Sequence, residues 1–153
     1  MPVKPKPDGY HTLTPMLCIE GAAQAIDFYK QAFGAEETMR FEHAGSVAHA
    51  ELRIGDSLFM FGEPWPGSEQ RSPKELGGSG AGLMIYVDDV DTAFARAVAA
   101  GAKVVHPLTD QFYGDRSGSL TDPFGHNWTI ATHREDVAPD EMMRRFREMM
   151  ASV

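Results

Sequence analysis

Two stretches of the chain repeat one order of hydrophobic and polar patterns. Each begins with a short apolar strand pattern, continues with a helical apolar stripe that ends in glycine, and closes with three alternating segments. The first copy spans residues 10–62 and the second spans residues 83–133. Each copy predicts a βαβββ module, and the repetition indicates a duplicated fold.

The first copy predicts a helix over residues 21–33, closed by Gly34, and an edge strand around Pro15, which has no amide proton to donate. Strands are expected at 11–19, 36–41, 47–54 and 57–61. In the third strand, alternation predicts one face facing the helix and one facing away. The helix-facing residues are expected to be Ala48, Ala50, Leu52 and Ile54, and the opposite face Val47, His49, Glu51 and Arg53.

The second copy predicts strands at 83–87, 103–107, 118–120 and 127–131, and a helix over 90–100. Asp122-Pro123-Phe124-Gly125 is typical of a tight turn. Between the copies, residues 63–82 form a connector rich in glycine and proline, with Trp65 as its bulky apolar residue; its length favours a lid or a mobile linker.

A final amphipathic helix is predicted over residues 136–151. Its apolar stripe consists of Met142, Met143, Phe146, Met149 and Met150. Such a stripe packs on its own domain or on a twin subunit.

Composition narrows the possible partners. The chain has 153 residues and a net charge of −8, which argues against nucleic acid and anionic membranes as partners. A single cysteine, Cys18, excludes an intramolecular disulfide and a cysteine-based zinc site. The chain shows no signal-peptide pattern and no apolar run near the ~20 residues of a membrane span, so a cytoplasmic location is expected.

Several motifs together resemble the vicinal-oxygen-chelate superfamily, which includes glyoxalase I, extradiol dioxygenases and bleomycin-resistance proteins. They are "FYKQAFGAEE", "YVDDVDTAFARAVAAGAKVV" and "DPFGHNWTIA", and the likeness covers about residues 12–132. The resemblance implies an α+β fold in which two tandem βαβββ modules form a curved, cup-like mixed sheet. It also implies a ligand held in the cup between the modules, and a homodimer.

In metal-using members, the resemblance implies four His or Glu ligands on matching strands. The matching positions here are Thr14, Phe59 or Met60, Gly82 and Thr129. None of these residue types is a carboxylate or imidazole, so no metal cofactor is expected. The alternative is a displaced divalent-metal site built from His11, His49 and Glu51.

Two groups of residues are candidates for binding. His49 and Glu51 share a strand face and could act as an acid–base pair, or simply form a solvated polar face. In the predicted loop 112–117, Tyr113 offers a stacking surface and Arg116 a fork of donors, unless Asp115 and Arg116 only close a turn. The complete set of expected ligand-binding residues is Thr14, His49, Glu51, Phe59, Tyr113, Arg116, Asn127 and Thr129.

The sequence therefore predicts a metal-independent small-molecule binding protein, of the sequestering or resistance type. The alternative is a glyoxalase- or dioxygenase-like enzyme, a lyase or oxidoreductase, that uses a displaced metal or the His49–Glu51 pair.

Overall fold

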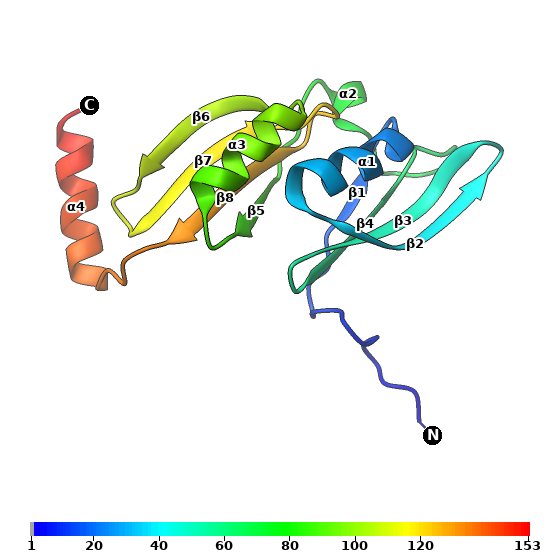
Figure 1. Cartoon of the computed structure of the whole chain (residues 1–153), viewed down its shortest axis with the longest axis horizontal. Coiled ribbons are helices and arrows are strands. Elements are labelled where there is room, and N and C mark those ends of the chain that lie inside the picture. The colour runs from blue at the N-terminus through cyan, green and yellow to red at the C-terminus, as the bar shows by residue number, and fades with distance from the viewer. Residues whose placement is uncertain (1) are drawn as a thin grey trace. The chain divides into compact units, whose positions relative to one another are not determined.

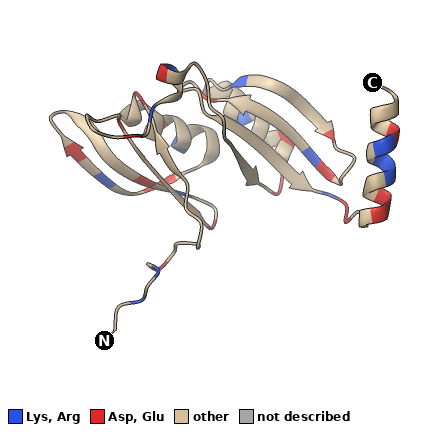
Figure 2. Cartoon of the chain, turned by 180° about the vertical axis from the view of Figure 1, so that it is seen from behind, with Lys and Arg blue, Asp and Glu red and all other residues tan. Residues whose placement is uncertain are grey.

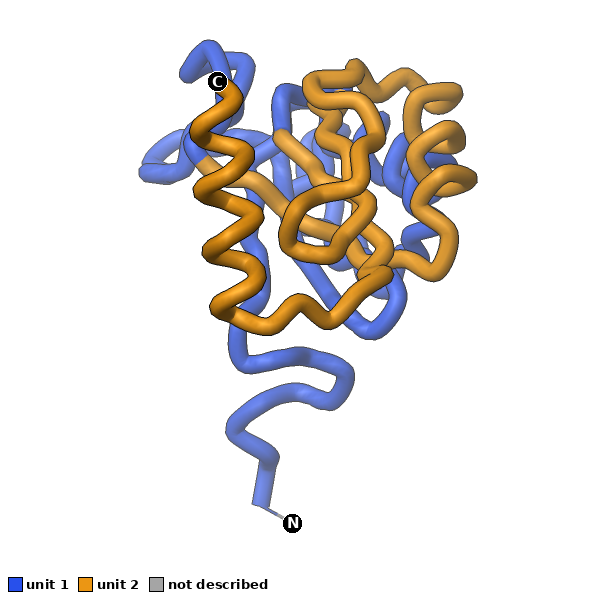
Figure 3. The backbone as a smooth tube through the Cα atoms, turned by 90° about the vertical axis from the view of Figure 1, so that its left-hand side faces the viewer, with its two compact units in different colours: residues 1–80, 123–126 blue, residues 81–122, 127–153 orange. Residues whose placement is uncertain are grey.

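The computed structural model describes residues 2–153, and the chain divides into two compact units (Figure 3). Unit 1 comprises the chain up to Gly80 together with Pro123–His126. Unit 2 comprises Ala81–Asp122 and Asn127–Val153. Each unit contains one four-stranded sheet, so the duplicated βαβββ pattern read from the sequence is confirmed.

Unit 1 has the strand order β1-β4-β3-β2, with β1 parallel to β4 and the other pairs antiparallel (Figure 1). Its elements are β1 (Met16–Cys18), α1 (Ala22–Phe33), β2 (Glu36–His43), β3 (Ser46–Ile54), β4 (Ser57–Gly62) and α2 (Pro73–Leu76). The predicted strand over 11–19 is wrong in its first half, because β1 begins only at Met16, after Pro15. The short helix α2 lies in the connector, where no helix was expected.

The core of unit 1 forms where α1 covers one face of the sheet (Figure 1). Tyr29 is fully buried, and its ring centroid lies 5.5 Å from that of Phe59 and 5.7 Å from that of Phe61. Burying side chains of this size stabilises the fold by roughly 1.5–3 kcal/mol each. The alternating apolar residues of β4 therefore fix which face of the sheet meets the helix.

A β-bulge changes the predicted faces of β3. Phe41 pairs with His49 and Glu42 with Val47, which leaves Ala48 without a partner on β2. Because of this extra residue, Val47 is buried and Ala48 is exposed, the reverse of the prediction. From His49 onward the prediction holds, since Leu52 is buried while His49 and Glu51 lie on the other face.

The turn Pro123–His126 belongs to unit 1. The Phe124 ring lies 6.1 Å from Phe28 and 6.4 Å from Tyr29, and His126 Nε2 lies 3.2 Å from the carbonyl oxygen of Cys18. Gly125 has φ of 93°, and a Cβ at this position would lie 2.7 Å from Cβ of Pro73. Both the backbone conformation and the close approach require glycine here.

Unit 2 repeats the architecture with the strand order β5-β8-β7-β6, β5 being parallel to β8. Its elements are β5 (Gly82–Tyr86), α3 (Val90–Ala100), β6 (Lys103–Asp110), β7 (Asp115–Thr121), β8 (Asn127–His133) and α4 (Pro139–Ala151). Asp89 caps α3 by accepting a hydrogen bond from the Thr92 amide at 3.2 Å. Trp128 and Ile130 of β8 are buried.

Helix α4 has no buried residue. Phe146 contacts Phe112 with ring centroids 5.6 Å apart, and Arg145 donates to the carbonyl oxygen of Phe112 and pairs with Glu135. Figure 2 shows acidic residues in its first turn and basic residues along its middle. No helix among residues 2–153 is long and apolar enough to cross a bilayer.

Candidate functional site

One row of side chains crosses the sheet of unit 1 on the face away from α1. The strand register sets Met39 opposite Glu51, Glu51 opposite Met60, and Met60 opposite Met16. Residues opposite one another in neighbouring strands point to the same face. A single carboxylate therefore lies among three thioethers.

Glu51 is held by two hydrogen bonds. His49 Nε2 lies 2.9 Å from one carboxylate oxygen, and the Tyr10 hydroxyl donates to the other. The Glu51 side chain is only 14% exposed. Burial alone would raise the pKa of Glu51, but the hydrogen bonds from Tyr10 and His49 outweigh it, so this pKa lies below its usual value. Glu51 therefore carries a negative charge at neutral pH.

Tyr10 shows the complementary effect. Its burial, its hydrogen bond to Glu51 and the nearby negative charge raise the pKa of Tyr10 to about 12. The phenol therefore stays protonated and remains a donor to Glu51. This residue lies in the segment before β1, and no sequence pattern identified it as part of a site.

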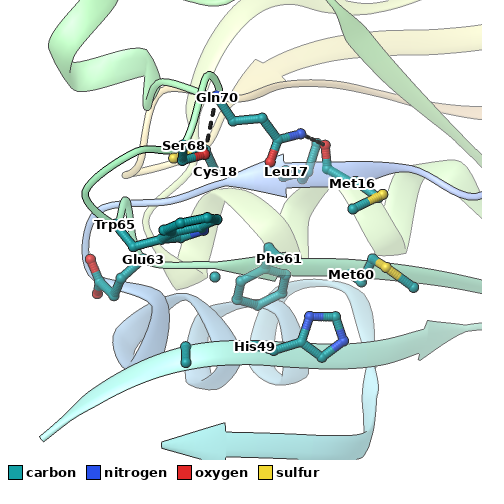
Figure 4. A pocket seen from close by; sticks show the side chains of 12 residues that line it. Met16, Leu17, Cys18, His49, Met60, Phe61, Glu63, Trp65, Ser68 and Gln70 are labelled. Carbon is teal, nitrogen blue, oxygen red and sulfur yellow. Dashed lines mark hydrogen bonds between the residues drawn. The ribbon is translucent and has the colours of Figure 1, made fainter. Parts of the chain in front are cut away.

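A pocket of about 110 Å³ lies beside this group (Figure 4). Strands β1, β3 and β4 form its floor and the connector forms its rim. Its lining residues are Met16, Leu17, Cys18, Ala48, His49, Met60, Phe61, Gly62, Glu63, Trp65, Ser68 and Gln70. Figure 4 shows the His49 imidazole and the side chains of Met16 and Met60 at one end, and the Trp65 indole at the other.

The connector, which forms the rim of the pocket, is bound to β1 through Gln70. The side-chain Nε2 of Gln70 lies 3.4 Å from the carbonyl oxygen of Met16, and its backbone amide donates to Ser68 Oγ at 3.2 Å. Trp65 is 64% exposed, an unusual position for so large an apolar side chain. The connector therefore supplies the aromatic surface of the pocket.

Gly62, the last residue of β4, and Glu63, which follows it, have different roles beside the pocket. A Cβ on Gly62 would lie 2.2 Å from the carbonyl oxygen of Ala48, so only glycine fits beside the bulge. Glu63 turns the other way, and its Oε1 accepts from the amides of Gly21 and Ala22 at 2.8 and 2.7 Å. A carboxylate at this place satisfies the start of α1, where Gly21 has no side chain to cap it.

The other candidates in unit 1 lie elsewhere. Thr14 precedes β1, and its hydroxyl donates to the carbonyl oxygen of His11 at 3.5 Å. His11 Nε2 lies 3.0 Å from the carbonyl oxygen of Asp56, so its contact is with a hairpin and not with His49. The expectation that Phe59 lines the site needs correction, because this ring is buried against Tyr29 on the α1 side of the sheet.

The structure offers a poor fit for the divalent metal that the fold implies. Thr14, Met60, Gly82 and Thr129 supply no carboxylate or imidazole. Across residues 2–153, no three His, Cys, Asp or Glu side chains are placed to hold one ion together. The donors that a divalent catalytic ion prefers are therefore not gathered at these positions.

The candidates in unit 2 are mostly engaged with their neighbours. Arg116 lies in β7 and not in a loop, and its guanidinium pairs with Asp91 at 2.9 Å and Asp110 at 3.3 Å. On the open face of β8, Asn127 Oδ1 accepts from Thr121 at 3.1 Å, and the hydroxyls of Thr129 and Ser119 lie 3.0 Å apart. These polar contacts tie β8 to β7.

Tyr113 lines a shallow depression of about 400 Å³ in unit 2. The other lining residues are His133, Asp136, Val137, Ala138 and Met142. The Tyr113 ring packs edge-on against Phe112, with ring centroids 5.1 Å apart.

A second Tyr–carboxylate–His group, missed by the sequence analysis, lies in unit 2. Asp115 is only 4% exposed, and accepts from the Tyr86 hydroxyl at 2.9 Å and from His133 Nδ1 at 2.7 Å. The other imidazole nitrogen lies 2.8 Å from Asp136. Hydrogen bonds to Asp136 and Asp115 raise the pKa of His133. The strand register of β7 and β8 pairs Asp115 with His133, but no local sequence pattern predicts this pairing.

This arrangement of two βαβββ units places the chain in a known family. The family model described as Glyoxalase/Bleomycin resistance protein/Dioxygenase superfamily matches residues 11–130, and the chain belongs to that superfamily.

Relatives at the level of sequence and structure agree with this assignment. An uncharacterized protein of Mycobacterium tuberculosis is 42% identical over 134 residues, covering 85% of this chain and 79% of that protein. The X-ray structure of an Arabidopsis thaliana gene product has a TM-score of 0.64 at 34% identity, covering 79% of this chain and 98% of that one. TioX from Micromonospora has a TM-score of 0.64 at 26% identity, covering 84% and 100%.

The fold is shared more widely than the sequence. The fosfomycin resistance protein FosX from Listeria monocytogenes has a TM-score of 0.60 at 16% identity, covering 86% of this chain and 97% of that one. This likeness shows the fold alone.

Proposed function

We propose that this protein binds a small organic molecule without the help of a divalent metal, in the manner of the sequestering members of its superfamily. The observation that carries the proposal is the pocket of unit 1, where an exposed indole faces an imidazole beside the ionised Glu51. Ligand sites combine apolar and aromatic walls with a few fixed polar groups. The pocket has this composition.

Each part of the pocket has a distinct task in this proposal. Trp65 supplies a flat apolar surface for an aromatic or conjugated ligand. The His49–Glu51 pair, 2.9 Å apart, supplies a hydrogen-bonding and charged group that fixes the orientation of the ligand. Gly62 keeps the floor open because no side chain projects from it.

The experiment is a thermal-shift screen of aromatic, thiol-adduct and cationic drug-like compounds, run in parallel with divalent ions and with a chelator. We expect some compounds to raise the melting temperature, and to raise it by the same amount with divalent ions as with the chelator. The stabilisation should disappear in Trp65→Ala and persist in Leu76→Ala, an exposed apolar residue of α2 that does not line the pocket. Stabilisation that appears only with added metal, or that survives in Trp65→Ala, would contradict the proposal.

The second candidate function is a glyoxalase- or dioxygenase-like enzyme with His49 and Glu51 as its acid–base pair. The hydrogen bond between an ionised carboxylate and an imidazole favours it, since the carboxylate can orient the ring for proton transfer. Turnover of thiol adducts that is abolished in both His49→Gln and Glu51→Gln would support the enzyme. Tight binding without turnover would favour sequestration.

We also propose that the protein acts as a cytoplasmic homodimer. The support for the homodimer is the exposed apolar stripe of α4, which includes Met143, Phe146 and Met150. Sedimentation equilibrium should give twice the mass of one chain, and Phe146→Ser should lower it. A monomer at micromolar concentration would overturn this part of the proposal.

A further inference from the structure

Three sulfur-bearing side chains line the same small pocket of unit 1. Met16 and Cys18 are two residues apart on β1 and share a face, and Met60 lies directly opposite Met16 on β4. Met16 is 60% exposed, so its thioether is presented to solvent. Thioether sulfur is polarizable and binds soft ions in preference to hard ones.

An imidazole completes the group. His49 points into the pocket at the end where Met16 and Met60 lie (Figure 4). Its Nε2 lies 2.9 Å from Glu51 Oε1, and no hydrogen bond to its Nδ1 is found among residues 2–153. With the proton on Nε2, the lone pair of Nδ1 is available to an ion. A carboxylate behind a histidine is the arrangement that orients metal-binding imidazoles and raises their basicity.

We propose that Met16, Met60 and His49 form a binding site for a soft monovalent ion, Cu(I), with Glu51 positioning His49 from behind. Two thioethers and one imidazole match the ligand preferences of Cu(I), whereas Mg²⁺, Ca²⁺ and Mn²⁺ require oxygen donors. The carboxylate supplies one negative charge next to a singly charged ion. This inference goes beyond the proposed function, because it adds a second kind of ligand to the pocket.

The direct test uses Ag(I), a soft monovalent ion that is stable in air, with the full-length protein. Methionine methyl groups labelled with ¹³C are followed by NMR during the titration. We expect the signals of Met16 and Met60 to shift together and to saturate at one ion per chain. The Met39 signal should stay, because Met39 lies in the same row but beyond Glu51 and does not line the pocket.

Competition with a chromogenic Cu(I) chelator under reducing conditions measures the affinity of each variant. Met60→Leu and Met16→Leu keep the side-chain volume and should each weaken Cu(I) binding at least tenfold. Met39→Leu is the matched control and should bind as the wild type does. Glu51→Gln should weaken binding by about 10- to 100-fold, the usual effect of removing the group behind a metal-binding histidine.

Several results would overturn the site. The site would be overturned if Met60→Leu bound Cu(I) as tightly as the wild type. It would also be overturned if Met39→Leu lost as much Cu(I) affinity as Met60→Leu. Loss of binding in Cys18→Ser, with Met16→Leu and Met60→Leu unaffected, would show capture by the thiol instead. Organic compounds that still stabilise a protein unable to bind Ag(I) would leave the proposed function standing and remove only the ion site.

Discussion

On the open sheet face of each unit a tyrosine, a carboxylate and a histidine are joined by hydrogen bonds, but their surroundings differ. Unit 1 joins Tyr10, Glu51 and His49, and unit 2 joins Tyr86, Asp115 and His133. In each case a tyrosine hydroxyl and an imidazole bind one carboxylate. The two groups differ in what the imidazole does with its second nitrogen.

In unit 2 the second nitrogen is occupied. His133 bridges Asp115 on β7 and Asp136 in the segment before α4, and the amides of Arg134 and Glu135 both donate to the carbonyl oxygen of Gly114. This group therefore fastens the chain that leads to α4. In unit 1, by contrast, His49 lines a pocket, and no hydrogen bond to its second nitrogen is found among residues 2–153. A tyrosine, a carboxylate and a histidine therefore stabilise a chain segment in unit 2, whereas in unit 1 the corresponding group lies beside the pocket that we propose binds ligand.

The largest expected effect is on the stability of unit 2. Asp115→Ala removes a buried carboxylate and leaves Tyr86 and His133 without their acceptor. Hydrogen bonds to a charged group contribute roughly 1.5–3 kcal/mol each, and one of the two lost here involves the half-exposed His133, so we expect the free energy of unfolding to fall by about 3 kcal/mol. Urea denaturation measures this loss. An unchanged midpoint would remove the structural role assigned to Asp115.

Glu51→Gln should have the opposite profile. We expect ligand affinity in the unit 1 pocket to fall about tenfold, since one charge-assisted contact is worth roughly 1.4 kcal/mol or more. The free energy of unfolding should change by less than about 1 kcal/mol, because Gln retains the shape and an acceptor for Tyr10. Calorimetric titration and urea denaturation of the same variant separate the two quantities. A large loss of stability with unchanged ligand affinity would contradict this prediction, because Glu51 would then have the same structural role as Asp115.

The pH dependence of stability tests the His133 bridge. The folded-state pKa of His133 is raised, so its contribution to stability is fully present below the unfolded pKa of about 6.5 and is lost as pH rises through the folded pKa. The melting temperature of the wild type should therefore decline over this window more steeply than that of His133→Gln. His43→Gln, at an exposed hairpin residue, is the control and should follow the wild type.

The smallest effect is expected at Arg116. Its guanidinium pairs with Asp91 and Asp110 within unit 2, and Arg116 is not among the residues that line the pocket of unit 1. Exposed ion pairs contribute little to stability. Arg116→Ala should therefore leave both the urea midpoint and ligand affinity unchanged within error. A clear loss of affinity would return Arg116 to the binding site.

The sequence pattern was sufficient for much of this fold because its signals are local. The apolar stripe of α1 and the glycine that follows it mark the position and the end of this helix, and Gly34 is its C-cap. His49 and Glu51 were predicted to share the open face for the same reason. Residues two positions apart in a strand point to the same face, so this relation can be predicted from the sequence alone.

The remaining features depend on contacts between distant segments. The bulge at Ala48 arises from the pairing of β3 with β2, and its carbonyl oxygen excludes a side chain at Gly62. Tyr10 reaches Glu51 across 41 positions, and Asp115 meets His133 through strand register. Arg116 was expected in a loop because its glycine-containing surroundings obscured the start of β7. Such partners are set by tertiary packing, which periodicity alone does not encode.

The most direct measurement is chemical-shift mapping by NMR with a compound that stabilises the protein in the presence of a chelator. If the unit 1 pocket is the ligand site, the largest chemical-shift changes will be in the signals of His49, Met60 and Trp65. The signals of Tyr86, Asp115 and His133 will not change. Shifts centred on Tyr86 and His133, with Trp65 unaffected, would contradict the division of roles between the two units.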